Sequence, residues 1–476
     1  MQTRRTMDDI KEIINPNEIF NAKTSFYRVT PGGKKLCSQE GFEKEYYPSG
    51  HKINDPAYYP DIIKNRPQDN STHGNSRDNI VIIPIERVSV PLQQIITTKH
   101  VTHVCGNTTK FTNATPVISN KDNEIMTKFK QAWLKRNMEV LKYRFVESLK
   151  RTGEAAVYMY LEDKKVKWRV FSNKDGDRLH PVYDQYQQLK YFGRSYTIKN
   201  NASGFTETFL EVFTKEFIYR YKENYNGDTN SINGWKLLEK VKHNYGKIPI
   251  VYAYNQDGPC WSDVQDLIDK FEMALSQLFE NNKSYAFRIM FIKGAVEVIG
   301  NLRGEARALV GDENTDAKFL EKADASNSFQ TQLENTFKFI QYGSFIVFPP
   351  EIKSGDTPSV AIKVVYSPAW EQAVKDINFL DPYFDEVIEM FKYYYGIEAG
   401  ITSDLKKLDI RGELIPYTHT NEQEVISNIN QSVTMGSLSV ETASEIHPYS
   451  KNNEYERLLT QKHNELKGER TIDADL

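Results

Sequence analysis

A change from a strand to a long helix within residues 246–287 restricts the fold of this chain more than any other feature. The stretch GKIPIVYAYNQDGPCWSDVQDLIDKFEMALSQLFENNKSYAF begins with a short apolar run and passes through a polar turn that contains Gly and Pro. It continues without either residue, and apolar side chains recur at helical spacing. A helix that runs to about Met290 is roughly 40 Å long at 1.5 Å per residue. Such a length suggests packing against several neighbours, including copies of the same chain.

The start of this helix carries its own signals. Ser262 followed by Gln265 matches a capping box, and Asp263 and Asp266 place negative charge in the first turn, where the helix dipole favours it. One apolar stripe along the helix predicts its packing face. The stripe consists of Val264, Leu267, Ile268, Phe271, Leu275 and Leu278.

The composition indicates a folded protein with no strong charge preference. Of the 476 residues, 39% are hydrophobic and 26% are charged, and the net charge is −3. This near balance argues against a basic nucleic-acid coat. No apolar run approaches the roughly 18 residues of a membrane helix, and residues 1–20 lack the apolar stretch of a signal peptide. The three widely spaced Cys residues argue against a disulfide framework and suit a reducing cytosol.

The pattern changes several times along the chain. Residues 1–79 are polar and rich in Asn, Pro, Tyr and Lys, which predicts a flexible arm. Residues 122–151 have apolar side chains near helical spacing. Residues 155–254 alternate apolar and polar side chains between polar turns, as β-hairpins do.

The second half repeats the strand-to-helix change. A helix is predicted at 329–343, followed by strands at 344–350 and 359–367. A second long helix then starts near Pro368, and Pro382 predicts a kink within it.

Signatures of catalysis are missing from the sequence. The chain contains no G-x-x-x-x-G-K-[ST], G-x-S-x-G or H-E-x-x-H motif. His100, His103 and Cys105 lie close together, but a zinc site needs about four ligands, and no second Cys/His pair has ligand spacing. A strand-like segment that happens to hold two His is therefore the simpler interpretation, and we predict no metal and no cofactor.

One acidic group leaves an enzymatic alternative open. Asp381, Asp385 and Glu389 recur every four residues on one helix face and could hold Mg²⁺ in a nuclease. A solvated face or an intersubunit surface explains the same spacing more simply.

The order of elements over roughly residues 80–465 resembles the portal (head-to-tail connector) protein of tailed double-stranded DNA bacteriophages of the siphophage type. The most informative passage joins a G-[RK]-[IV]-P-[IV] strand, a polar turn and an S-D-x-x-x-x-L-I-D helix, which are GKIPI and SDVQDLID here. Three other passages support the resemblance: PIERVSVPLQQIITTKHVTHVCGNTTKFT, NMEVLKYRFVESLKRTGEAAVYMYLEDKKVKWRVF and SLSVETASEIHPY.

This resemblance implies an α+β portal fold with a mixed α/β wing, two long stem helices, an α/β clip and a small helical crown. The opening helix and the helix at 369–395 would be the paired stem helices. The implied divisions are a flexible arm (1–79), the wing (80–261), the first stem helix (262–293), the clip (294–366), the second stem helix (367–396), a channel loop (397–412) and the crown (413–476).

The family resemblance also implies the function. The chain would form a ring, typically of twelve subunits, at one capsid vertex of the virion after assembly in the host cytoplasm. Double-stranded DNA would pass through this ring without sequence-specific contacts during packaging and ejection. The implied partners are other copies of the chain, the terminase large subunit, the head-tail adaptor and the major capsid or scaffold protein, with no membrane. It would not be an enzyme.

One departure from the family pattern affects the channel loop. The family follows its second stem helix with a tunnel loop and a long wing helix, whereas only IEAGITSDLKKLD follows residues 369–395 before the next predicted strand. Either the long helix is missing or 369–395 is misassigned. Lys406, Lys407 and Arg411 are the candidate DNA-facing residues, and a solvated loop is the alternative. A metal-dependent phage nuclease or a different minor virion structural protein remains the competing function.

Overall fold

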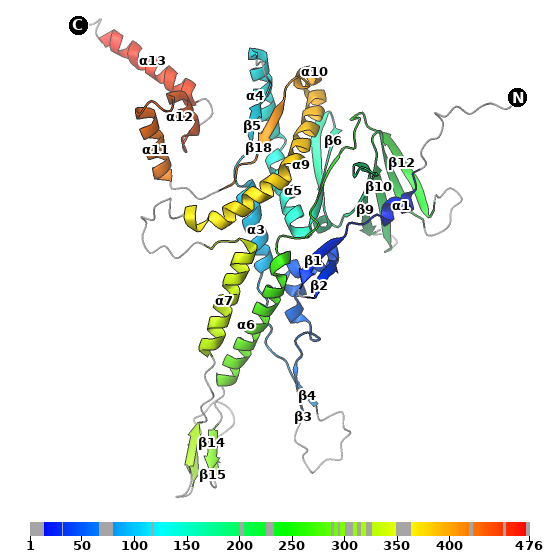
Figure 1. Cartoon of the computed structure of the whole chain (residues 1–476), viewed down its shortest axis with the longest axis vertical. Helices are drawn as coiled ribbons and strands as arrows, with labels where there is room; N and C mark the ends of the chain where they lie inside the picture. Colours follow the sequence, from blue (N-terminus) through cyan, green and yellow to red (C-terminus); the bar gives the residue numbers. More distant parts are fainter. Residues whose placement is uncertain are drawn as a thin grey trace, which may run out of the picture.

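The computed structural model has an elongated shape, with a helical pair and small strands extending from a mixed α/β body (Figure 1). The residues that it describes are 14–30, 32–65, 80–115, 119–199, 204–224, 233–286, 290–293, 296–299, 308–311, 316–319, 326–348, 363–417, 422–450 and 454–472.

The body is built around a three-stranded sheet covered by helices. The strands have the order β13-β6-β7, all antiparallel, with β6 in the middle. Aromatic side chains fill the core, and Phe391 packs edge-on against both Phe129 and Trp133. The elements are β6 (Glu154–Glu162), β7 (Lys165–Phe171), β13 (Ile250–Tyr254), α3 (Leu92–Cys105), α4 (Asn120–Lys135), α5 (Met138–Thr152) and α9 (Ser367–Ala399).

A second, five-stranded antiparallel sheet lies beside this body (Figure 1). Its order β12-β11-β10-β9-β8 follows the chain in a meander, which is what alternating runs joined by short polar turns predict. The strands are β8 (Arg178–Tyr183), β9 (Leu189–Lys199), β10 (Thr206–Phe213), β11 (Phe217–Glu223) and β12 (Trp235–Lys242), and η4 (Asn173–Asp175) precedes them.

The helix predicted over residues 122–151 is two helices. The chain turns at Asn137, which adopts a left-handed conformation with φ 55°, and α5 begins at the next residue. Asn tolerates this conformation better than most side chains. The apolar spacing runs through the break, so periodicity alone does not locate it.

The prediction of a flexible arm over 1–79 is wrong for 14–30 and 32–65. A few apolar side chains anchor this segment to the body, and Ile19, Phe26, Phe42 and Ile53 are almost fully buried. Residues 1–13 and 66–79 lie outside the described residues. The elements are α1 (Pro16–Asn21), β1 (Phe26–Thr30), β2 (Gly33–Cys37), α2 (Gln39–Tyr46), η2 (Pro48–Gly50), η3 (Lys52–Asn54), β3 (Ile62–Asn65) and β4 (Ile80–Ile83).

The packing of α1 on the five-stranded sheet can be tested at Gly193. A Cβ at this position would lie 2.5 Å from Ile19 Cγ2 and 3.0 Å from His180 Cβ. We expect Gly193→Ala to cost about 1–3 kcal/mol through overpacking and to expose α1 to protease. Urea unfolding and limited proteolysis measure both effects. Gly32→Ala, which meets only Thr30 Oγ1 at 4.0 Å, is the control, and equal behaviour of the two variants would contradict the packing.

The remaining elements extend from the two ends of the body (Figure 1). At one end lie the long helices α6 and α7 and two strand pairs, β14 with β17 and β15 with β16. At the other, β18 pairs with β5, and three helices follow. Their bounds are β5 (Lys110–Asn113), η5 (Ser262–Val264), α6 (Gln265–Ala286), β14 (Met290–Lys293), β15 (Val296–Ile299), β16 (Ala308–Gly311), β17 (Asp316–Phe319), α7 (Ser326–Ser344), α10 (Thr402–Leu405), β18 (Ile410–Glu413), α11 (Glu422–Thr434), α12 (Val440–Ile446) and α13 (Glu454–Ile472).

The strands predicted at 344–350 and 359–367 do not form in the residues that can be described. Ser344 ends α7, residues 346–348 are irregular, and residues 363–365 are already helical. Residues 349–362 lie outside the described part. No helix in the described part of the chain is long and apolar enough to cross a membrane.

Candidate functional site

The long helix α6 packs against α7 over an apolar seam. Ile268 of α6 and Ile340 of α7 are fully buried, and the Phe271 and Phe337 rings lie 5.9 Å apart. Of the predicted packing residues, Leu267, Ile268 and Phe271 join this seam, whereas Leu275 and Leu278 are half-buried.

The predicted pairing of α6 with the helix at 369–395 is therefore wrong. That helix is part of α9, whose Phe384, Val387 and Phe391 belong to the core of the body. α9 also continues through Pro382. The helix that lies beside α6 is α7 (Figure 1), which falls inside the region expected to be the clip.

The predicted capping box at the start of α6 does not form. Ser262 lies in the short helix η5, and its Oγ accepts a hydrogen bond from Arg28 Nε at 3.2 Å. Gln265 donates to Asp269 Oδ1 at 2.7 Å. Gln265 Oε1 also accepts from Gln93 Nε2 of α3 at 3.1 Å. Both side chains thus contact segments distant in sequence, and Arg28 and α3 compete for the groups that a local cap would use.

A second face of α6 is polar, and its Glu272 and Ser276 side chains are buried. Glu272, Ser276 and Glu280 accept hydrogen bonds from the backbone N–H groups of Val90, Val88 and Glu86, at 2.7, 2.9 and 3.4 Å. Every second residue of the extended segment meets every fourth residue of the helix. The match works because two extended residues rise about 6.6 Å and four helical residues about 6 Å. This polar stripe of Glu272, Ser276 and Glu280 thus holds residues 86–90 along the helix.

The N-terminal segment closes over the same face. His51 Nδ1 lies 2.7 Å from Glu272 Oε1, and both side chains are only 1% exposed. Lys52 forms an ion pair with Asp269. The buried side chains of Glu272 and Asp269 need partners, so these contacts hold the base of α6 against the N-terminal segment.

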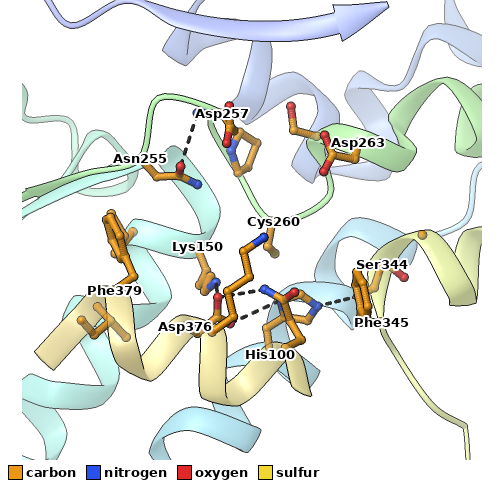
Figure 2. A pocket seen from close by; sticks show the side chains of 17 residues that line it. His100, Lys150, Asn255, Asp257, Cys260, Asp263, Ser344, Phe345, Asp376 and Phe379 are labelled. Carbon is orange, nitrogen blue, oxygen red and sulfur yellow. Dashed lines mark hydrogen bonds and ion pairs between the residues drawn. The ribbon is translucent and has the colours of Figure 1, made fainter. Parts of the chain in front are cut away.

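A pocket of about 310 Å³ lies where α3, α5, α7 and α9 meet (Figure 2). Lys150 Nζ is 2.5 Å from Asp376 Oδ1, and His100 Nε2 is 2.7 Å from the carbonyl of Ser344 at the end of α7. This carbonyl can only accept, so Nε2 carries the proton and Nδ1 is the acceptor in neutral His100.

The ionisation of this pocket follows from its burial. Burial lowers the pKa of His100 to about 4, with Lys150 acting in the same direction and Asp376 opposing. His100 Nδ1 faces Asp376 Oδ2 at 3.9 Å, and among the described residues neither atom has a hydrogen-bond partner. Burial also raises the pKa of the Cys260 thiol to about 11. The pocket therefore joins the helical pair to the body through the neutral His100 and the Lys150–Asp376 ion pair.

The candidate DNA-facing residues lie elsewhere. Lys406 and Lys407 are exposed just after α10. Arg411 is exposed on β18, where its Nη2 lies 3.4 Å from Asp409 Oδ2. In Figure 1, α10 lies at the opposite end of the long axis from β14 and β15. The three cations are close in sequence, and the structure places them away from α6 and α7 (Figure 1).

Neither candidate metal group, the one with His100 or the one with Asp381, forms a metal site. His100 and His103 bond the backbone carbonyls of Ser344 and Tyr417, and burial raises the pKa of Cys105 to about 12. Within the described residues, no group of three or more His, Cys, Asp or Glu side chains could hold a metal ion.

The acidic face of α9 is largely exposed to solvent. Asp385 and Glu389 are exposed, and Glu389 pairs with Lys392 at 2.5 Å. Burial raises the pKa of Asp381, and the Asp385 carboxylate adds to this rise.

Comparison with known proteins gives one sequence family and a set of distant structures. The family described as phage portal protein, SPP1 Gp6-like, matches residues 43–468. No curated protein sequence matches significantly. The neck of an empty GTA particle, computed with C6 symmetry, matches with 11% identity and a TM-score of 0.39, covering 78% of this chain and 90% of that chain. A virion of a native gene transfer agent particle matches with 10% identity and a TM-score of 0.36, covering 77% and 89%.

Proposed function

Because the chain belongs to the SPP1 Gp6-like family of phage portal proteins, we propose that it forms the ring through which double-stranded DNA enters and leaves a phage capsid. Proteins of this family are structural components of the virion, not enzymes, and form homo-oligomeric rings. The match over residues 43–468 carries this proposal. The long, paired helices α6 and α7 supply the kind of element from which a channel wall can be built.

The contacts of α6 support a revised division of the chain. α6 and α7 become the two stem helices, and residues 287–325 between them become the clip. α9 becomes the long helix of the wing. This order removes the apparent departure from the family pattern, because the tunnel loop then falls between α7 and α9. It also moves the channel loop away from residues 397–412, so Lys406, Lys407 and Arg411 lose the positional argument for facing DNA.

The partners follow from the revised division. The clip, at the far end of the stem, would meet the terminase large subunit during packaging and the head-tail adaptor afterwards. The five-stranded sheet would lie in the wing, and α11, α12 and α13 would form the crown. The ring, of about twelve subunits by family resemblance, would assemble in the host cytoplasm, contact the major capsid or scaffold protein and occupy one vertex.

Negative-stain microscopy of the purified full-length chain tests this proposal. We expect rings with an axial hole over a range of salt concentrations. Uniformly monomeric particles at every salt concentration would contradict it. Incubation of supercoiled DNA with Mg²⁺ is the parallel assay, and we expect no cleavage by the wild type or by Asp385→Asn.

A further inference from the structure

The ribbon formed by β3 and β4 exposes an apolar face beside the stem. Ile63 pairs directly with Ile82, so both side chains lie on one face of the ribbon. They are 67% and 63% exposed. Ile62 pairs with Ile83 on the other face, where both side chains are more covered. Within the described residues, the ribbon joins no larger sheet.

Such a ribbon is poorly stabilised by itself. A two-stranded ribbon is at best marginally stable in water, and exposed apolar strand pairs promote association. Its base is nevertheless held firmly. Arg87 forms an ion pair with Asp61 at 2.8 Å and donates to the Tyr59 carbonyl, while Ile85 N–H donates to Asp61 Oδ1. The ribbon is thus presented at a defined place, and its Ile63–Ile82 face is left open.

A matching apolar surface lies on the other flank of the stem. Phe339 and Tyr342 of α7 are 61% and 71% exposed. At about 100° per residue, they point away from Phe337 and Ile340, which contact the α6 side. α6 lies between α7 and the segment that leads to the ribbon (Figure 1). The ribbon and α7 therefore lie on opposite flanks of the stem (Figure 1), and neither apolar surface covers the other within one chain.

We propose that the Ile63–Ile82 face of one copy packs on the Phe339–Tyr342 face of α7 in the next copy. This inference rests on the proposed ring, because opposite flanks meet only in a head-to-tail assembly. The sizes are compatible: directly paired side chains such as Ile63 and Ile82 lie about 5 Å apart, and Phe339 and Tyr342, three residues apart, lie about 4.5 Å apart along the helix axis. The contact would cover both apolar surfaces and hold adjacent stems together.

Disulfide cross-linking tests the contact directly. The variant carries Ile63→Cys and Tyr342→Cys, with Cys37→Ser to remove the native thiol on the β1–β2 hairpin. After mild oxidation of assembled protein, we expect a ladder of covalent oligomers on non-reducing gels that collapses to monomer on reduction. Each single variant should give no ladder. The control pair joins Ile63→Cys to Tyr186→Cys, since Tyr186 is equally exposed at 76% but lies between β8 and β9.

Assembly of charged variants gives a second measurement. We expect Ile63→Asp with Ile82→Asp to lower the fraction of chains in rings at least tenfold, with the far-UV circular dichroism of the monomer unchanged. Leu36→Asp, at a position 64% exposed on β2, should leave assembly unchanged. Rings that form without a cross-linked ladder would overturn the ribbon contact and leave the portal function standing. A chain that never forms rings would overturn both.

Discussion

Replacing Glu272 by Ala is expected to lower the free energy of unfolding by about 2–5 kcal/mol, because each of two buried donors left without an acceptor costs about 1–3 kcal/mol. Glu272 Oε1 accepts from both His51 Nδ1 and the Val90 N–H. The substitution leaves both donors without that acceptor in a region closed to water. The base of α6 would then separate from the segment that leads into α3.

Glu280, at the outer end of the same polar stripe, supplies the control. Glu280 accepts from the Glu86 N–H at 3.4 Å near the surface, so Glu280→Ala should change the free energy of unfolding by less than about 1 kcal/mol. Urea unfolding of both variants, followed by tryptophan fluorescence, measures the difference; Trp261 lies at the start of the stem and is fully buried. Equal midpoints for the two variants would show that the stripe does not hold residues 86–90.

The polar face of α6 illustrates what periodicity misses. The apolar stripe that includes Ile268 and Phe271 was predictable, because helical spacing alone places these side chains on one side. Asp269, Glu272 and Ser276 have the spacing of a solvated face, yet they are buried. Their partners come from residues 51–52 and 88–90, and no local rule connects segments so far apart in sequence. The signal in the sequence that could have indicated this contact is the second stripe, Glu272, Ser276 and Glu280, in which hydrogen-bond acceptors recur every four residues.

The assignment of the second stem helix failed for a related reason. α7 and α9 are both amphipathic, and length favoured α9. The burial of α9 is wider: Ile388 and Met390 are both buried, although they lie about 160° apart around the helix. A helix covered on so much of its circumference belongs inside a body. On α7, Phe339 and Tyr342 remain open opposite the buried Ile340, which suits a stem at an intersubunit surface.

The N-terminal segment shows the limit of composition. Its polar residues predicted an arm, and single anchors such as Phe26 and Phe42 do not form a periodic pattern. Their rings lie 5.4 Å apart, edge to face, against the turn after β13. Family resemblance, in contrast, came from the order of elements and survived the errors in their boundaries, because the GKIPI strand and the SDVQDLID helix start are local features.

Acidification is expected to destabilise the wild type between pH 6.5 and pH 4, and His100 should account for about 3 kcal/mol of the loss. Burial lowers the pKa of His100 from 6.5 to about 4. The unfolded chain therefore binds a proton in this range that the folded chain does not, so the stability present above pH 6.5 is lost as the pH falls toward 4. Each unit of pKa difference is worth about 1.4 kcal/mol.

The variant His100→Gln isolates this contribution. Its side-chain amide can still donate to the Ser344 carbonyl, but it cannot take up a proton. The difference between its free energy of unfolding and that of the wild type should therefore change by about 3 kcal/mol from pH 7 to pH 4. Carboxylates distant from His100 affect both proteins equally and cancel. His463→Gln, at an exposed position of α13, should run parallel to the wild type. If the stability of His100→Gln also changes with pH in parallel with that of the wild type, His100 takes up its proton equally in the folded and unfolded chains. The junction of α3, α7 and α9 would then be open to water, which would contradict a buried pocket that joins the stem to the body.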